Sequence, residues 1–219
     1  MHDPRLTRFH WPEAPRGIIL LLHGGEESSS EPVGSRQSSW WRMALIACAL
    51  RSSARRNDLA VVLLRYHVRG WNDLHAPDPV ADARWALDLL RGELHGVPIV
   101  LVGHSMGGRT ACRVADDEAV VGVCALAPWL PEGEPVAALT DRSLHVLHGT
   151  HDRWTSARWS RDFVERCRPI AISASWRSLP GAGHFMLRRV RDWNRFVTDS
   201  LCQILGPTTT TESASEGTE

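Results

Sequence analysis

Lysine is absent from the sequence, so all 25 of its basic residues are arginine. This absence excludes enzymes that form a Schiff base on lysine, pyridoxal-phosphate enzymes that depend on one, and lysine-containing phosphate-binding loops. The formal net charge is zero, and acidic and basic residues are spread along the chain. We therefore expect no nucleic-acid partner and no polybasic membrane anchor. Small or neutral partners fit this composition better.

Long apolar runs are missing as well. No stretch approaches the roughly 18 apolar residues of a membrane span, and Met1 to Arg5 lacks the apolar core of a signal peptide. These absences predict a cytoplasmic protein without a membrane partner. The five cysteines form no Cys-x-x-Cys pair and are expected to be reduced core thiols: Cys48, Cys112, Cys124, Cys167 and Cys202.

Apolar runs that suit buried parallel strands alternate with amphipathic helices, which predicts a parallel α/β sheet. The expected strands are Gly17 to Leu22, Leu59 to Leu64, Pro98 to Val102, Val120 to Leu126, Leu144 to Leu147 and Ser175 to Leu179, with an edge strand at Arg5 to Trp11. The expected helices are Ser39 to Arg51, Pro79 to Leu94, Met106 to Asp116, Thr155 to Cys167 and Phe185 to Leu205. Length and composition favour one domain over residues 1–205, followed by a disordered polar tail over residues 206–219.

A serine lies at the junction between an apolar strand and a helix, in the stretch Gly103-His104-Ser105-Met106-Gly107. A serine hydroxyl is a useful nucleophile only where a base can reach it, and a sharp turn flanked by glycines presents it in that way. The stretch resembles the nucleophile elbow of the α/β-hydrolase family. The resemblance implies a mostly parallel twisted sheet flanked by helices on both faces, and it makes Ser105 the expected nucleophile.

The loops around this site differ in length. Between Leu130 and Ser143 there are only about a dozen residues, too few for the helical cap that many related enzymes insert there. We therefore expect a site without a lid. Glu26 to Ser38 is by contrast a long polar loop, which either shapes access to the site or is a solvated linker.

The family places an acid after a later strand and a histidine after the last one. Asp152 follows the apolar strand Leu144 to Leu147, and His184 follows the last predicted strand. The resemblance therefore implies that Asp152 orients His184, which acts as the general base. Other interpretations stay open, because Asp152 also suits the N-cap of the next helix, and Glu132 or Asp141 could supply the carboxylate instead.

Near the N-terminus, Leu20-Leu21-Leu22-His23-Gly24-Gly25 resembles the family's oxyanion segment. The resemblance implies that the backbone N–H groups of Gly25 and Met106 bind the negatively charged oxygen of the reaction intermediate. His23 is expected to brace this loop. The implied mechanism requires no metal and no organic cofactor.

Three closely spaced histidines, His145, His148 and His151, look superficially like a metal cluster. Residues three apart on a strand point to opposite faces, so these side chains are not expected to converge on one ion. We therefore predict no metal site.

Ten tryptophans are present. Trp129 and Trp154 follow strand ends on the side of the expected site, where they would either line a substrate pocket or pack structurally. The tryptophans in predicted helices are expected to pack on the sheet: Trp40, Trp41, Trp85, Trp159 and Trp193. Arg69 could contact an anionic substrate group, although a surface arginine is the simpler interpretation.

The resemblance as a whole implies a serine esterase or thioesterase that acts on a small acyl substrate through an acyl-enzyme on Ser105. Amidases, acyltransferases and perhydrolases use the same residues, so the sequence does not separate them. A non-catalytic binding protein on the same scaffold is the alternative from another class. It would be expected to lack one of the catalytic residues or the oxyanion glycines. Nothing in the sequence indicates an oligomeric state.

Overall fold

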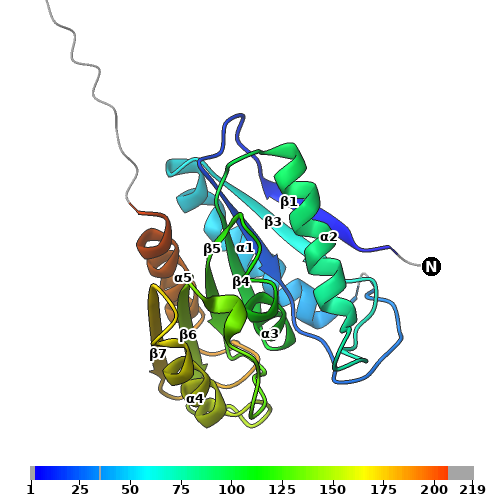
Figure 1. Ribbon diagram of the computed structural model, residues 1–219, viewed down its shortest axis with the longest axis vertical. Helices are drawn as coiled ribbons and strands as arrows, with labels where there is room; N and C mark the ends of the chain where they lie inside the picture. The colour runs from blue at the N-terminus through cyan, green and yellow to red at the C-terminus, as the bar shows by residue number, and fades with distance from the viewer. Residues whose placement is uncertain (1–2, 35, 207–219) are drawn as a thin grey trace, which may run out of the picture.

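The computed structural model describes residues 3–34 and 36–206, within which seven strands join one sheet (Figure 1). The strands are β1 (Arg5–His10), β2 (Gly17–Leu22), β3 (Leu59–Arg65), β4 (Ile99–His104), β5 (Val120–Leu126), β6 (Ser143–Gly149) and β7 (Ser173–Leu179). β1 is antiparallel to its neighbour β3, and all other neighbouring strands are parallel. The predicted strands, including the N-terminal edge strand, are confirmed.

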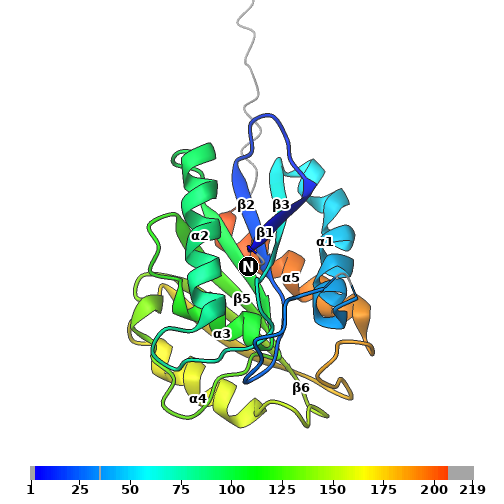
Figure 2. The ribbon, with the colours of Figure 1, turned by 90° about the vertical axis from the view of Figure 1, so that its right-hand side faces the viewer.

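Helices cover both faces of the sheet (Figure 2). They are α1 (Ser38–Arg56), α2 (Asp78–Glu93), α3 (Met106–Arg113), α4 (Ala157–Cys167) and α5 (Val190–Leu205). α1 and α5 pack together on one face, whereas α2, α3 and α4 lie on the other. The predicted fold class, a mostly parallel sheet with helices on both faces, is confirmed.

Burial explains the composition of the central strands. Every residue of β2 and β4 is buried, because these strands lie in the middle of the sheet with helices above and below them. Both strands are accordingly continuous runs of Val, Leu and Ile with few interruptions. The edge strands β1 and β7 keep partly exposed residues.

The strand order, β1-β3-β2-β4-β5-β6-β7, places one reversal of direction at the centre. The chain passes from β2 to β3 on one side and later from β4 to β5 on the other. In open α/β sheets, ligands bind outside the carboxyl ends of the strands at such a reversal. Gly24 and Ser105 follow the ends of β2 and β4, so the fold places both beside this crevice.

No cap covers that crevice in the residues that the structure describes. The connection between β5 and β6 contains a single turn of 3₁₀ helix, Ala137–Leu139. The expectation of a site without a lid is confirmed.

Among the helices of the described residues, none combines the length and apolar character needed to span a bilayer.

The start of α5 differs from the prediction, since the helix begins at Val190 and not at Phe185. Met186 and Arg189 adopt left-handed backbone conformations, with φ of 57° and 59°. A right-handed helix cannot contain such residues without strain. The preceding residues instead form the loop that carries His184.

Other helix ends also differ. Ser156 caps α4, because its Oγ accepts a hydrogen bond from the backbone N–H of Trp159 at 3.2 Å. The interpretation of Asp152 as the cap of this helix is therefore wrong. α3 ends at Arg113, earlier than the predicted Asp116, whereas α1 runs beyond its predicted end.

Four side chains that were expected in the core are exposed. Cys48 and Cys202 lie on the surface, whereas the other three cysteines are buried. Trp41 is 53% exposed and Trp159 is 41% exposed. Consecutive helical residues point about 100° apart, so in α1 only Trp40 of the Trp40-Trp41 pair faces inward.

The predicted C-terminal tail, residues 206–219, is described only at Gly206. Its remainder, 207–219, lies outside the described residues.

Candidate active site

Ser105 occupies a strained turn between β4 and α3. Its φ is 56° and its ψ is −120°, a conformation that side chains rarely adopt. The flanking glycines make the turn possible: a Cβ on Gly103 would lie 2.2 Å from the carbonyl oxygen of Gly107, and one on Gly107 would lie 2.2 Å from that of Leu22. The turn therefore holds Ser105 at the carboxyl end of β4.

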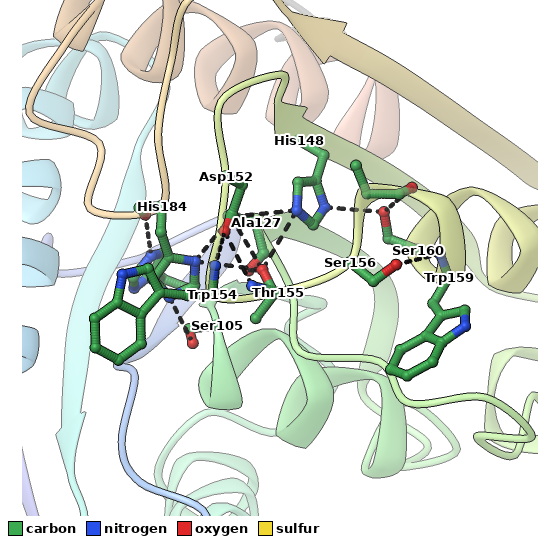
Figure 3. A network of polar contacts seen from close by, with 12 residues as sticks. Ser105, Ala127, His148, Asp152, Trp154, Thr155, Ser156, Trp159, Ser160 and His184 are labelled. Atoms are coloured by element: carbon green, nitrogen blue, oxygen red, sulfur yellow. Dashed lines mark hydrogen bonds and ion pairs between the residues drawn. The ribbon is translucent and has the colours of Figure 1, made fainter.

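His184 and Asp152 converge on this serine from two other strand ends (Figure 3). His184 Nε2 lies 3.0 Å from Ser105 Oγ, and His184 Nδ1 lies 2.8 Å from Asp152 Oδ2. The acid can accept only from an Nδ1–H group, so the neutral ring presents a bare Nε2 to the serine hydroxyl. The predicted nucleophile, base and acid thus form one continuous hydrogen-bonded line.

Asp152 is surrounded by donors. Its Oδ1 accepts the backbone N–H groups of Trp154 and Thr155 at 2.8 and 2.9 Å, and its Oδ2 also accepts the Thr155 hydroxyl at 3.0 Å. Burial pushes the pKa of Asp152 upward, but the hydrogen bonds from His148, His184 and Thr155 together outweigh burial. They hold the pKa well below its ordinary value, so the carboxylate is ionised.

A second histidine, His148, also contacts the acid, a role that the sequence analysis did not predict for it. His148 is fully buried, its Nε2 lies 3.2 Å from Asp152 Oδ2, and its Nδ1 lies 2.9 Å from Ser160 Oγ. The indole N–H of Trp176 donates to the same Ser160 Oγ at 3.0 Å. The network therefore extends from the acid through β6 and α4 to β7. Figure 3 shows its part from Asp152 through His148 to Ser160, with His148 on the side of the carboxylate opposite His184.

Two more buried histidines border the site, and neither is hydrogen-bonded to Asp152 among the described residues. His104 Nε2 lies 2.9 Å from the carbonyl oxygen of His184, and His23 accepts the backbone N–H of Tyr66. Burial, aided by the nearby His184, lowers the pKa of His104 to about 3. Burial likewise lowers the pKa of His23 to about 4. Both rings are neutral in the folded protein at pH 7, and His23 braces the loop after β2 as predicted.

These two histidines predict a loss of stability in mild acid. In the unfolded chain each binds a proton below pH 6.5, whereas in the folded chain neither does until pH 4 or lower. The unfolded state therefore binds more protons in this window, and the free energy of unfolding falls as pH decreases from 6.5. At pH 5 the expected loss is about 2 kcal/mol per histidine.

Denaturant unfolding at pH 7 and pH 5 measures this loss. In His23→Gln the difference between the two pH values is expected to shrink by about 2 kcal/mol, because one of the histidines that titrate in this window is gone. Equal unfolding free energies at both pH values in the unmodified protein would contradict the assignment.

The backbone donors predicted for the oxyanion lie beside Ser105. Gly25 packs directly against Met106, since a Cβ on Gly25 would lie 2.4 Å from Met106 Cε. Across the described ranges, neither the N–H of Gly25 nor that of Met106 has a hydrogen-bond acceptor in the protein. Two unpaired N–H groups next to a serine hydroxyl can receive a negatively charged oxygen.

A pocket of about 530 Å³ opens over these groups. Trp129 and Trp154 both line it together with Ser105 and His184. The Trp154 ring stacks on the His184 ring with centroids 6.4 Å apart, and it is 73% exposed. The backbone N–H of Trp129 donates to the Ser105 carbonyl at 3.0 Å. Both tryptophans therefore line the pocket, which is one of the two placements left open by the sequence analysis.

A buried ion pair anchors the helix behind the serine. Arg109 in α3 contacts Glu134 at 2.7 Å, and both residues are almost fully buried. The Arg109 guanidinium also lies against two indole rings, 4.0 Å from the ring centre of Trp71 and 4.5 Å from that of Trp129. This arrangement connects the position of α3 to the pocket wall. Nothing in the sequence distinguished Arg109 or Glu134 from surface residues.

The sequence profile of one family, described as the alpha/beta hydrolase family, matches residues 19–209. The chain belongs to the alpha/beta hydrolase family. No protein of curated function matches the sequence significantly. Membership agrees with the resemblance that the elbow at Ser105 suggested.

Solved structures of other alpha/beta hydrolases share the fold at low identity. An alpha-beta serine hydrolase homologue from Coxiella burnetii is 18% identical with a TM-score of 0.68, covering 90% of each chain. A serine hydrolase without a lid from Xanthomonas campestris is 14% identical with a TM-score of 0.68, covering 94% of this chain and 97% of that one. An esterase from Thermogutta terrifontis with bound butyrate is 17% identical with a TM-score of 0.65, covering 92% and 90%.

Among the described residues, the other candidates for the acid and the candidate for an anionic substrate group do not contact the Ser105, His184 and Asp152 side chains. Glu132 and Asp141 are exposed, and neither contacts His184, which pairs with Asp152. Arg69 pairs with Glu31 at 2.6 Å, within the two loops that follow β2 and β3. Part of the long polar loop lines the pocket, which favours its role in shaping access over that of a solvated linker. Within the described residues, no group of three or more His, Cys, Asp or Glu side chains is arranged so that it could hold a metal ion.

Proposed function

We propose that the protein is a serine hydrolase that cleaves a carboxylic ester or thioester of a small acyl substrate. The observation that carries the proposal is the hydrogen-bonded line from Ser105 Oγ through His184 to Asp152, with distances of 3.0 and 2.8 Å. A serine, a base and an orienting acid in this geometry form an activated nucleophile. The line opens into the pocket, where a substrate carbonyl can approach it.

In the proposed first step, the Ser105 oxygen attacks the carbonyl carbon while Nε2 of His184 takes the hydroxyl proton. The ring becomes an imidazolium ion, which the ionised carboxylate of Asp152 stabilises and keeps in orientation. The N–H groups of Gly25 and Met106 bind the oxyanion that forms. Loss of one such donor typically costs about 3 kcal/mol of transition-state stabilisation.

In the second step, His184 returns its proton to the departing alcohol or thiol, and an acyl group remains on Ser105. A water molecule then attacks the acyl carbon with His184 as its base, and the serine is released. Ser105, His184 and water account for every proton in this scheme, so it needs no metal or organic cofactor.

The open pocket supports a small acyl substrate. Without a cap, the pocket walls come from loops that follow the strands and from the start of α1, and the large apolar side chains among them are Trp129, Trp154 and Phe185. We assign Trp129 and Trp154 to substrate binding. The esterase from Thermogutta terrifontis was solved with butyrate, a short acyl group, which is compatible with this assignment.

Hydrolysis of a series of nitrophenyl esters, from acetate to long chains, tests the proposal. Turnover of short-chain esters is expected, and no turnover of any member by folded protein would contradict it. Trp154→Ala removes an indole next to His184, so the ratio of kcat/KM for octanoate over acetate should rise about tenfold. Trp159→Ala is the matched control, because Trp159 is exposed on α4 outside the pocket (Figure 3). An unchanged ratio in Trp154→Ala would remove Trp154 from the substrate site.

A further inference from the structure

Arg42 is a cation without an anionic partner in the pocket that contains Ser105. It comes from the second turn of α1 and is half-buried. Its guanidinium lies 5.0 Å from the centre of the Phe185 ring. Among the residues that the structure describes, it makes no ion pair and no hydrogen bond. A half-buried charge of this kind is costly unless something pairs with it.

Two other arginines near the pocket are paired. Arg69 contacts Glu31, and Arg109 contacts Glu134. For Arg42, burial lowers the pKa below its ordinary value, and no neighbouring carboxylate acts in the opposite direction. The missing counter-charge is therefore expected to come from outside the protein.

Ser39 adds a second unused polar group to the same wall. It lies one helical turn before Arg42 on α1, and both residues line the pocket. Ser39 is 9% exposed, and its buried hydroxyl has no hydrogen-bond partner in the described structure. A guanidinium and a hydroxyl on one helix face together provide the donors that a carboxylate accepts.

The position of Arg42 also bears on catalysis. Arg42 and His184 flank the same Phe185 ring, with the two rings of His184 and Phe185 5.3 Å apart. In the proposed mechanism His184 becomes positively charged, and an unpaired guanidinium nearby disfavours that charge. A substrate anion on Arg42 would cancel this effect. The anion of such a substrate would stabilise the transition state in addition to strengthening substrate binding.

Two carboxylates share the pocket, but they do not replace such an anion. Glu26 and Glu27 line it as well, and both are exposed to solvent. Over the part of the chain that the structure describes, neither forms an ion pair with Arg42. Solvent and salt screen exposed charges more strongly than half-buried ones, so the buried part of this wall is positive.

We propose that Arg42, with Ser39, binds a carboxylate carried by the ester substrate. The inference rests on the proposed hydrolase function and narrows its substrate class to anionic esters. The carboxylate could belong to the acyl part, as in a monoester of a dicarboxylic acid, or to the alcohol part. A purely structural role, in which Arg42 only packs on Phe185, makes a different prediction: its replacement would affect charged and neutral esters equally.

The test compares each charged ester with its neutral methyl ester. For the acyl arm the probes are mono-nitrophenyl adipate and methyl nitrophenyl adipate, and for the alcohol arm para-acetoxybenzoate and its methyl ester. In Arg42→Gln, the ratio of kcat/KM for charged over neutral substrate should fall about 30-fold in the arm whose carboxylate reaches Arg42. This factor is the size expected for a charge-assisted hydrogen-bonded pair. Arg42→Lys keeps the charge, so the ratio should fall less in that variant. Arg51→Gln, on an exposed position of the same helix, should retain the ratio.

Binding separates this inference from the hydrolase proposal. Calorimetry with monomethyl adipate on Ser105→Ala, and on Ser105→Ala combined with Arg42→Gln, reports the carboxylate site without turnover. Weakening of about 30-fold in the double variant supports the site even if no ester is hydrolysed. If esters are hydrolysed but the ratio in both arms and the affinity are independent of Arg42, the carboxylate site is overturned and the hydrolase proposal stands. Should Arg42→Gln fail to fold, Ser39→Ala and Arg42→Lys test the same subsite, and in each the ratio of charged over neutral substrate should fall by a factor smaller than about 30.

Discussion

Replacing Ser105 with alanine is expected to lower kcat for ester hydrolysis by about 10⁵-fold or more. The substitution removes the atom that would form the acyl-enzyme, and no other hydroxyl is shown within hydrogen-bonding distance of His184 Nε2 among the described residues. Because alanine keeps the Cβ and the same strained φ of 56°, the free energy of unfolding should change by no more than about 1 kcal/mol. Steady-state kinetics and denaturant unfolding measure the two quantities.

Ser178→Ala is the matched control for this experiment. Ser178 is exposed on β7, so its loss should leave both kcat and stability close to those of the unmodified protein. If Ser105→Ala retains more than about a tenth of the activity, hydrolysis does not pass through this serine.

Asp152→Asn should lower kcat by about 10⁴-fold, because the amide favours the wrong tautomer of His184. Oδ2 of Asp152 accepts from His184, His148 and the Thr155 hydroxyl. An NH₂ group in place of this oxygen would face donors instead of accepting from them. His184 would then carry its proton on Nε2, where it cannot take the proton of Ser105.

The two other carboxylates considered from the sequence serve as controls. Asp141→Asn and Glu132→Gln change exposed residues that make no contact with His184. Each should leave kcat within about twofold of its original value. A larger loss of kcat in either variant than in Asp152→Asn would show that Asp152 is not the acid that orients His184.

Local sequence patterns sufficed for part of this site. The turn at Ser105 depends on Gly103 and Gly107, whose missing side chains are visible in the sequence. Asp152 and His184 follow strands whose apolar runs mark their ends, so their place at one sheet edge could be predicted. Both depend on contacts near in sequence or on the regular geometry of a parallel sheet.

Other parts depend on packing between distant segments, which no short pattern records. His148 reaches Ser160 only because α4 packs against β6, and Arg109 reaches Glu134 across the connection after β5. That Arg42 lacks an anionic partner can likewise be recognised only when the residues around it in the fold are known. The late start of α5 follows from left-handed residues at Met186 and Arg189, neither of which is a residue type that favours this conformation.

The most direct test of the account is the mass of the protein after reaction with a fluorophosphonate, followed by peptide mapping. A serine activated by His184 and Asp152 is expected to form one stoichiometric adduct, located on the peptide that contains Ser105. The adduct should be absent from Ser105→Ala and strongly reduced in Asp152→Asn. Folded protein that stays unlabelled, or that carries the adduct on another residue, would contradict the assignment of Ser105 as the nucleophile and favour a scaffold that binds without catalysis.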